Sequence, residues 1–265
     1  MHLLEVTGLT KRFGGLVAIA NLDFNVEKGV ILGIIGPNGA GKTTLYNLIT
    51  GFIKPTGGKV LFKGKDITRL SANRRASIGL VRNFQTTGLF NEMTCLESMM
   101  VAHHLSRKTW IPAQLFKSAG FRKEDRRIRE NADEILSYMG MEGLKDIVVK
   151  NLPHGHLRAL GVALALAANP ELLLLDEPVT GMNETETENM IEKIKGIRAE
   201  RGITTLVVEH HMSAIMGLSD RIMVINFGKK IADGIPRDVV QNRDVIEAYL
   251  GVQKERDNGS VSKKL

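Results

Sequence analysis

The sequence predicts an α/β fold with a mostly parallel sheet, an antiparallel β subdomain and an inserted α-helical subdomain. Three short runs carry the parallel sheet: 30–35 (VILGII), 172–175 (LLLL) and 204–208 (TTLVV). Runs that are apolar almost throughout are typical of strands buried on both faces. A helical stretch at 184–200 separates the last two runs, and alternation of buried strands with helices indicates a parallel sheet.

The other elements follow in chain order. Alternating runs at 3–6 and 22–26 predict half-buried antiparallel strands, and 59–62 predicts an edge strand before a turn at Gly64. From 94 to about 144 the spacing becomes helical, with a loop near Trp110 to Pro112. We therefore expect a helical subdomain over about 90–165 within a domain spanning 1–251. A further helix is predicted at 155–168, and the polar residues 252–265 predict a disordered tail.

Composition limits the classes of function. The chain has 265 residues and one cysteine, Cys95, which excludes an internal disulfide and a CxxC motif. No stretch approaches the roughly 20 apolar residues of a spanning helix. The formal net charge is +7, but acids interrupt the basic runs, as in RKEDRRIRE at 122–130, and aromatic residues are only 5%. We therefore expect no nucleic-acid partner, because base stacking needs an aromatic platform.

A glycine-rich loop follows the first buried run. GPNGAGKT at 36–43 fits GxxxxGK[ST] and stands between the run VILGII and a stretch that can form a helix. Such a loop turns backbone N–H groups toward phosphate, Lys42 adds charge, and the Thr43 hydroxyl can ligate Mg²⁺. A turn that merely joins strand to helix is the alternative. The expected nucleotide-binding residues are Gly36, Pro37, Asn38, Gly39, Ala40, Gly41, Lys42, Thr43 and Thr44.

Two adjacent acids, Asp176 and Glu177, end the run LLLL. Burying either charge unpaired is costly. The structural alternative is therefore that the strand simply ends in a polar turn that contains both acids. The functional explanation places Asp176 on Mg²⁺, directly or through water, and gives Glu177 the attacking water to orient or deprotonate. Together the two motifs predict nucleotide hydrolysis on a P-loop NTPase core.

At this point the chain resembles the ATPase subunits of ABC transporters, over about 3–251. The resemblance implies ATP and Mg²⁺ as cofactors. It implies that Phe13 stacks on adenine and that His210 contacts the γ-phosphate. It also implies that Gln85 senses the γ-phosphate side and ligates magnesium. The expected catalytic residues are Glu177, His210 and Gln85, and the expected magnesium ligands are Thr43, Gln85 and Asp176.

Longer segments resemble the subgroup that drives importers of branched-chain amino acids, with related members serving urea or other polar solutes. The segments are 81–104, 172–187, 207–234 and 243–251. The resemblance implies a second ABC ATPase in a head-to-tail homodimer or heterodimer, two transmembrane permeases, and a periplasmic or extracellular solute-binding protein. It also implies a peripheral location on the cytoplasmic face of the inner membrane.

One motif departs from the family. Where most members have LSGGQ, which completes the partner's ATP site in trans, this chain has LPHGH, so only Leu152 and Gly155 coincide. His154 and His156 are unusual there. They are tolerated substitutions whose backbone still holds phosphate, or they mark a weakened site, or they ligate a metal. Related departures are Gly161, Leu164 and Asn183.

Three functions therefore compete on the sequence. The first is a hydrolysing ATPase that drives transport. The second is a regulatory subunit that binds ATP but hydrolyses it slowly because of the altered signature. The third is an ABC-type ATPase acting on DNA or ribosomes, which is disfavoured because the chain predicts one ATPase domain and no long coiled-coil insertion.

Overall fold

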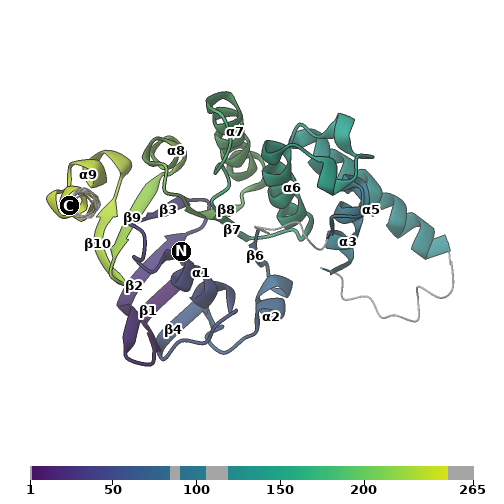
Figure 1. Cartoon of the computed structure of the whole chain (residues 1–265). Coiled ribbons are helices and arrows are strands. Elements are labelled where there is room, and N and C mark those ends of the chain that lie inside the picture. Colours follow the sequence, from purple (N-terminus) through teal and green to yellow (C-terminus); the bar gives the residue numbers. More distant parts are fainter. Residues whose placement is uncertain (1, 84–89, 106–118, 250–265) are drawn as a thin grey trace, which may run out of the picture.

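The computed structural model describes residues 2–83, 90–105 and 119–249. Its larger sheet has the strand order β10-β9-β3-β8-β7-β6 and runs from β10 on the left of Figure 1 to β6 near the centre. Strands β6 to β9 and β3 pair in parallel, and β10 is antiparallel to β9. The strands are β3 (Ile31–Ile35), β6 (Leu80–Arg82), β7 (Leu172–Asp176), β8 (Thr204–Val208), β9 (Arg221–Asn226) and β10 (Lys229–Gly234).

The three predicted buried strands are confirmed as β3, β7 and β8, neighbours at the middle of this sheet. Their side chains alternate between two cores. Ile31, Ile35 and Leu173 pack with residues of the helices on one face, whereas Leu32 and Leu174 pack with the antiparallel sheet and α1 (Lys42–Thr50) on the other. All residues of the three strands are buried, which explains why their sequences show no alternation of apolar and polar residues.

The smaller sheet is antiparallel, with the order β2-β1-β4-β5. Its strands are β1 (His2–Phe13), β2 (Leu16–Glu27), β4 (Gly57–Phe62) and β5 (Lys65–Asp66). The predicted strands 3–6 and 22–26 are much too short, because register shifts along β1 and β2 break the apolar–polar alternation. The edge-strand prediction for 59–62 is wrong, since β4 lies between β1 and the two-residue β5.

Helices cover the larger sheet and extend past its β6 end. Helices α3 (Cys95–Leu105), α5 (Ala119–Tyr138) and α6 (His154–Ala167) pack together. Of the three, α6 lies nearest the sheet in Figure 1. The predicted helices at 155–168 and 184–200 are confirmed as α6 and α7 (Glu184–Arg201). The remaining helices are α2 (Ala72–Ser77), α8 (Met212–Leu218) and α9 (Pro236–Gln241).

The subdomain bounds of about 90–165 and the domain span of 1–251 stay predictions. The loop near Trp110 and the tail at 252–265 lie outside the described residues. Across the described ranges, every helix is too short or too polar to cross a bilayer.

A buried tyrosine fixes α1 against the sheet. The Tyr46 hydroxyl lies 3.0 Å from the carbonyl oxygen of Leu175 on β7 and 2.6 Å from that of Leu206 on β8. Tyr46 is fully buried, and burial raises the pKa of its phenol well above the ordinary value, so the group remains a donor. The helix that follows the glycine-rich loop is thereby held against the strands that end in the acidic pair.

Replacing Tyr46 by Phe should lower the free energy of unfolding by about 1 to 2 kcal/mol, because two buried carbonyls lose a hydroxyl partner. The matched control is Tyr138→Phe, which removes a half-buried hydroxyl bonded to the carbonyl of Lys193 and should cost less than about 1 kcal/mol. Urea unfolding without nucleotide measures both. Equal losses would contradict the role given to Tyr46.

Candidate active site

The glycine-rich loop lies between the end of β3 and the start of α1. At Gly36 an added Cβ would lie 2.1 Å from the carbonyl oxygen of Ile225, and at Gly41, with φ of 104°, it would lie 2.7 Å from that of Ala18. Neither position therefore accepts a side chain. The loop is also held from outside, because the Gly228 amide donates to the carbonyl of Ala40. Its shape is set by contacts with β2 and with the turn after β9.

Lys42 begins α1 and bends back over this loop. Its Nζ donates to the carbonyl oxygens of Gly36 at 2.5 Å and Pro37 at 3.0 Å. Burial lowers the pKa of Lys42, and the charges of Glu177 and Asp176 oppose that effect. The lysine therefore lies at the mouth of the loop within the electrostatic reach of both acids, as the sequence predicts. Its hydrogen-bond partners are carbonyl oxygens, and a phosphate oxygen would be a stronger one.

Glu177 and His210 meet where β7 and β8 end side by side. Asp176 is paired with Val208 in the ladder, and the Glu177 amide donates to the Val208 carbonyl. Glu177 has a φ of 49°, a strained conformation for a residue with a side chain. Its Oε1 lies 3.4 Å from Nδ1 of His210. The predicted water-activating acid and the predicted γ-phosphate histidine are therefore neighbours.

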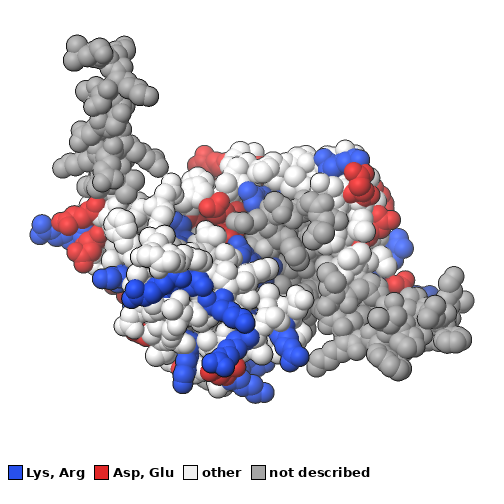
Figure 2. All heavy atoms as spheres, turned by 60° about the horizontal axis from the view of Figure 1, so that its bottom comes forward, with Lys and Arg blue, Asp and Glu red and all other residues white. Residues whose placement is uncertain are grey.

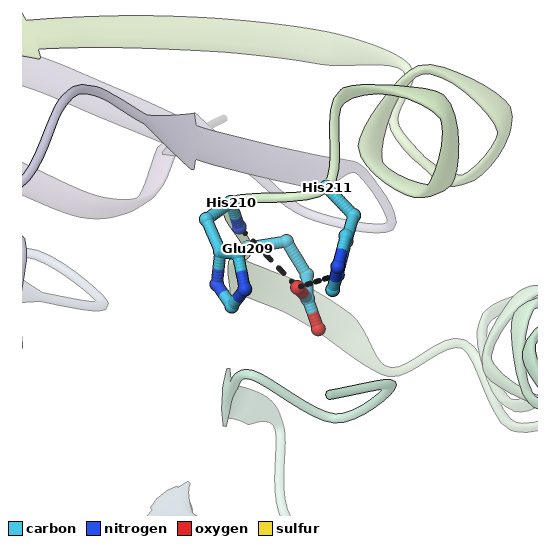
Figure 3. A group of neighbouring side chains, drawn as sticks. All are labelled: Glu209, His210 and His211. Carbon is cyan, nitrogen blue, oxygen red and sulfur yellow. Dashed lines mark hydrogen bonds and ion pairs between the residues drawn. The ribbon is translucent and has the colours of Figure 1, made fainter. Parts of the chain in front are cut away.

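Glu209 is a buried acid that holds the backbone next to this pair. Its side chain is 1% exposed, its Oε1 accepts a hydrogen bond from the Val179 amide at 3.0 Å, and its Oε2 accepts one from the His210 amide at 3.3 Å. Figure 3 shows its carboxylate between the rings of His210 and His211. Burial raises the pKa of Glu209, whereas the two amides and two imidazoles lower it. This acid fixes the chain on both sides of the site.

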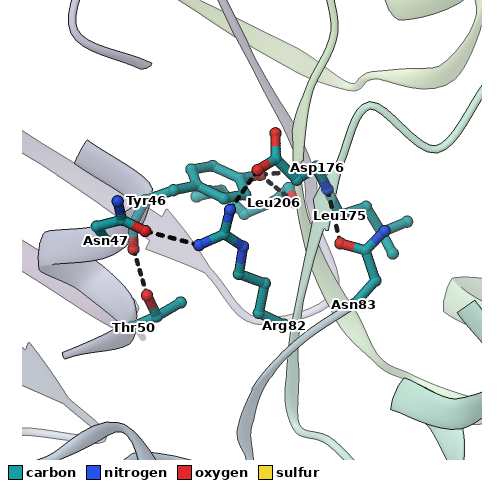
Figure 4. A network of polar contacts seen from close by, with 8 residues as sticks. All are labelled: Tyr46, Asn47, Thr50, Arg82, Asn83, Leu175, Asp176 and Leu206. Carbon is teal, nitrogen blue, oxygen red and sulfur yellow. Dashed lines mark hydrogen bonds and ion pairs between the residues drawn. The ribbon is translucent and has the colours of Figure 1, made fainter. Parts of the chain in front are cut away.

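Asp176 belongs to a buried polar network (Figure 4). Its Oδ2 accepts a hydrogen bond from Nη2 of Arg82, whose Nη1 donates to Oδ1 of Asn47 on α1 at 2.7 Å. The Asp176 amide donates to Oδ1 of Asn83 at 2.9 Å. Burial raises the pKa of Asp176, and the charge and hydrogen bond of Arg82 lower it. Arg82 therefore opposes the effect of burial on this acid, and it ties the end of β7 to α1 through Asn47.

The donor set fits a nucleotide with a magnesium ion. Thr43 stands in the first turn of α1, and its hydroxyl and the Asp176 carboxylate are oxygen ligands of the kind that Mg²⁺ prefers. The amides of the first turn of α1 and the positive end of that helix favour phosphate. An added Cβ at Gly39 would meet nothing within 4 Å, so the loop is open there. Anionic phosphate and a hard cation both have partners at this site.

Two further predicted residues are Phe13 and Gln85. Phe13 ends β1 at the tip of the first hairpin and is about half exposed, with Nζ of Lys11 4.8 Å from its ring centroid. Gln85 lies outside the described residues, so its predicted roles as catalytic residue and magnesium ligand stay predictions.

The signature segment begins α6. Leu152 is buried, and His154 and His156 stand with Gly155 in the first turn of the helix. An added Cβ at Gly181 would lie 2.8 Å from the ring of His154, and one at Gly155 would lie 3.0 Å from the Glu186 carboxylate. The segment therefore packs on the turn that follows Glu177, a turn that ends with Asn183 capping α7.

Sequence reasoning missed Arg82 and Glu209. Arg82 ends a three-residue strand, and its partner Asp176 is 94 positions away, so no local pattern identifies it. Glu209 had a usable signal, because it directly follows the buried strand β8 as Glu177 directly follows β7. An acid directly after a buried apolar strand is easily buried itself, and burying its charge without a partner is costly.

The fold and the site together define an ATPase of the P-loop class. Residues 19–180 match the family model described as ABC transporter, and residues 229–255 match the one described as branched-chain amino acid ATP-binding cassette transporter. The chain belongs to the ABC transporter family, as an ATP-binding, ATP-hydrolysing subunit.

Relatives match over almost their whole length. The high-affinity branched-chain amino acid transport ATP-binding protein BraF of Pseudomonas aeruginosa is 42% identical over 249 residues, which cover 94% of this chain and 98% of BraF. LivG of Escherichia coli, of the same description, is 41% identical with the same coverage. Among solved structures, the ADP conformation of MJ1267, an ATP-binding cassette of an ABC transporter, has a TM-score of 0.83 at 32% identity and covers 95% of this chain and 99% of its own.

Removing Arg82 should leave Asp176 as an unpaired buried carboxylate. Arg82→Met is therefore expected to lower the free energy of unfolding by about 3 kcal/mol. The double variant with Asp176→Asn should recover at least about 1 kcal/mol of that loss, because the buried charge is then gone. Urea unfolding of the native chain, both single variants and the double variant measures the coupling. Strictly additive losses would show that the two side chains do not depend on each other.

Proposed function

We propose that this subunit powers the import of branched-chain amino acids. The match of residues 229–255 to the model of that transporter class supports the proposal, as do the names of BraF and LivG. Urea or another small polar solute is the alternative cargo. The contact between Glu177 and His210 beside the glycine-rich loop is the observation that carries the reaction itself.

In the proposed mechanism, residues 36–44 hold the phosphate tail and Lys42 neutralises part of its charge. Thr43, Asp176 and Gln85 hold magnesium, which when bound supplies positive charge at the β- and γ-phosphates. Phe13 stacks on adenine. Glu177 orients the attacking water and accepts its proton, and His210 restrains the Glu177 carboxylate while donating to the γ-phosphate.

Hydrolysis in the proposed assembly needs a second ABC ATPase subunit, in a head-to-tail homodimer or heterodimer. In the proposed assembly the partner's signature segment, equivalent to Leu152, His154, Gly155 and His156, reaches the bound nucleotide in trans. The first-turn amides of α6 supply the phosphate contacts, so the imidazoles need not do so. The proposed partners are a second ABC ATPase subunit, two permeases and a periplasmic or extracellular solute-binding protein. The proposed location is the cytoplasmic face of the inner membrane.

The signature also supports a second candidate, a regulatory subunit with slow hydrolysis. The ring of His154 fills the space beside Gly181, where the chain turns from Glu177 into α7. A bulky side chain at that point can shift the turn that carries the water-activating acid. Steady-state hydrolysis by the chain alone and with its partner ATPase separates the two candidates.

Basic surface favours a third candidate, an ATPase that acts on nucleic acid. Lys and Arg side chains gather on the face shown in Figure 2, which brings the antiparallel sheet and α2 forward. Exposed basic residues of this region are Arg12, Lys54, Lys59, Lys63, Lys65, Arg69 and Arg74. Our proposal includes no nucleic-acid partner, and tight, salt-sensitive DNA binding would contradict it.

Glu177→Gln should retain Mg·ATP binding and lose hydrolysis by at least about 100-fold, because the amide cannot accept the proton of water. Glu188→Gln, an exposed change on α7, is the matched control and should leave the rate unchanged. Phosphate release and calorimetric ATP binding are the two measurements. Full turnover by Glu177→Gln would remove that residue as the base.

Affinity purification of the tagged chain from membranes should recover two permeases and a second ATPase. Cells that lack the chain should lose high-affinity uptake of labelled leucine and keep urea uptake. Loss of urea uptake alone would move the assignment to the alternative cargo. Co-purification with ribosomes or DNA and without permeases would contradict the transport assignment.

A further inference from the structure

Two imidazoles and a buried carboxylate converge at the end of β8. One ligand atom each from Glu209, His210 and His211 can be chosen so that all lie within 4.8 Å of one another. Nδ1 of His211 lies 3.7 Å from Oε2 of Glu209, and the two ring centroids are 4.4 Å apart. Figure 3 shows both rings beside the same carboxylate. The three groups come from consecutive residues, so the fold fixes their proximity.

Within the described residues, Glu209 forms no ion pair with a lysine or an arginine. Its carboxylate pairs with the His211 imidazole, and both His210 and His211 act on it electrostatically. The contacts from the opposing turn and from the neighbouring backbone are amides, Val179 N and His210 N. A buried carboxylate is stable when paired, protonated or bound to a metal. The ring nitrogens of the two imidazoles beside it are ligand atoms of the kind that transition-metal ions accept.

The ligand types select the ion. Imidazole nitrogen with carboxylate oxygen suits Zn²⁺ and its first-row neighbours, whereas Mg²⁺ takes oxygen ligands. Zinc needs ligand distances of about 2.0–2.2 Å, so the rings must move inward. Both can, since the side chains of His210 and His211 are 43% and 53% exposed. The Glu177 carboxylate lies beside this group, with its Oε1 3.4 Å from Nδ1 of His210.

We propose that Glu209, His210 and His211 bind Zn²⁺ or a similar transition-metal ion, and that the bound ion holds the ATPase inactive. The inhibitory half rests on the proposed function, in which His210 and Glu177 act at the γ-phosphate. An ion that ligates His210 and attracts Glu177 removes both from that work. Magnesium does not compete, because it takes oxygen ligands and its proposed ligands are Thr43, Asp176 and Gln85. The site therefore separates a required metal from an inhibitory one by ligand chemistry alone.

His211 is the residue that tests the site, because it has no place in the proposed hydrolysis. Calorimetric titration of the full nucleotide-free chain with Zn²⁺ should give one site at Glu209–His211. His211→Asn should weaken that binding by at least about tenfold, since loss of an outer-shell partner alone costs as much at metal sites. The matched control is His154→Tyr with His156→Gln, which removes two imidazoles elsewhere and should bind zinc as the native chain does.

Anomalous diffraction from crystals soaked in zinc should place the ion among the three side chains. Native affinity in His211→Asn would overturn the proposal, as would an ion found on His154 and His156 instead.

Hydrolysis at saturating Mg·ATP tests the inhibitory half. Stoichiometric Zn²⁺ should abolish most of the native rate and spare His211→Asn, which without zinc should hydrolyse ATP as the native chain does. Equal inhibition of both chains would overturn this half. A chain that binds zinc as expected but never hydrolyses ATP would instead refute the proposed function, so the two failures are distinguishable.

Discussion

The parallel pairing of β3, β8 and β7 is the constraint on which the site depends. It brings three chain segments to one edge of the sheet: the glycine-rich loop after β3, the acidic pair after β7, and Glu209 with His210 after β8. None of these segments is near another in sequence. A shift of one residue in either pairing would move Asp176 or Glu209 to the opposite face of the sheet. Tyr46 spans the two strands that carry the acids and therefore reports on the same pairing.

The charged groups at this edge differ in how far they are buried and in which partners hold them. Asp176 is compensated by Arg82, Glu209 by backbone amides and imidazoles, and Lys42 by loop carbonyls. Glu177, about one-third exposed, is the acid left most open to water and to His210. Among the three acids, Asp176 and Glu209 are buried and held by fixed partners, whereas Glu177 is the open one. This suits a reactive Glu177, because a group that accepts a proton needs access to its water. The altered signature meets this arrangement at the turn after Glu177, where the ring of His154 packs beside Gly181.

Much of this could be predicted from the sequence. The buried strands were predictable because burial on both faces leaves nearly continuous apolar runs, and the loop was predictable because its glycines and lysine are consecutive. The antiparallel strands were underestimated where bulges interrupt the alternation in β1. The ion pair of Arg82 with Asp176 depends on contacts across 94 positions and has no local pattern. Local patterns therefore identify functional groups that lie within a few residues of one another. Contacts between groups far apart in the sequence are set by the tertiary fold and have no such pattern.

The central claim is that residues 36–43 and the acids at 176 and 177 form one nucleotide site. Calorimetric titration of the pure folded chain with Mg·ATP tests it most directly. The account predicts saturable binding with one nucleotide per chain, and loss of that binding in Lys42→Ala. Absence of any heat of binding up to millimolar Mg·ATP would contradict it.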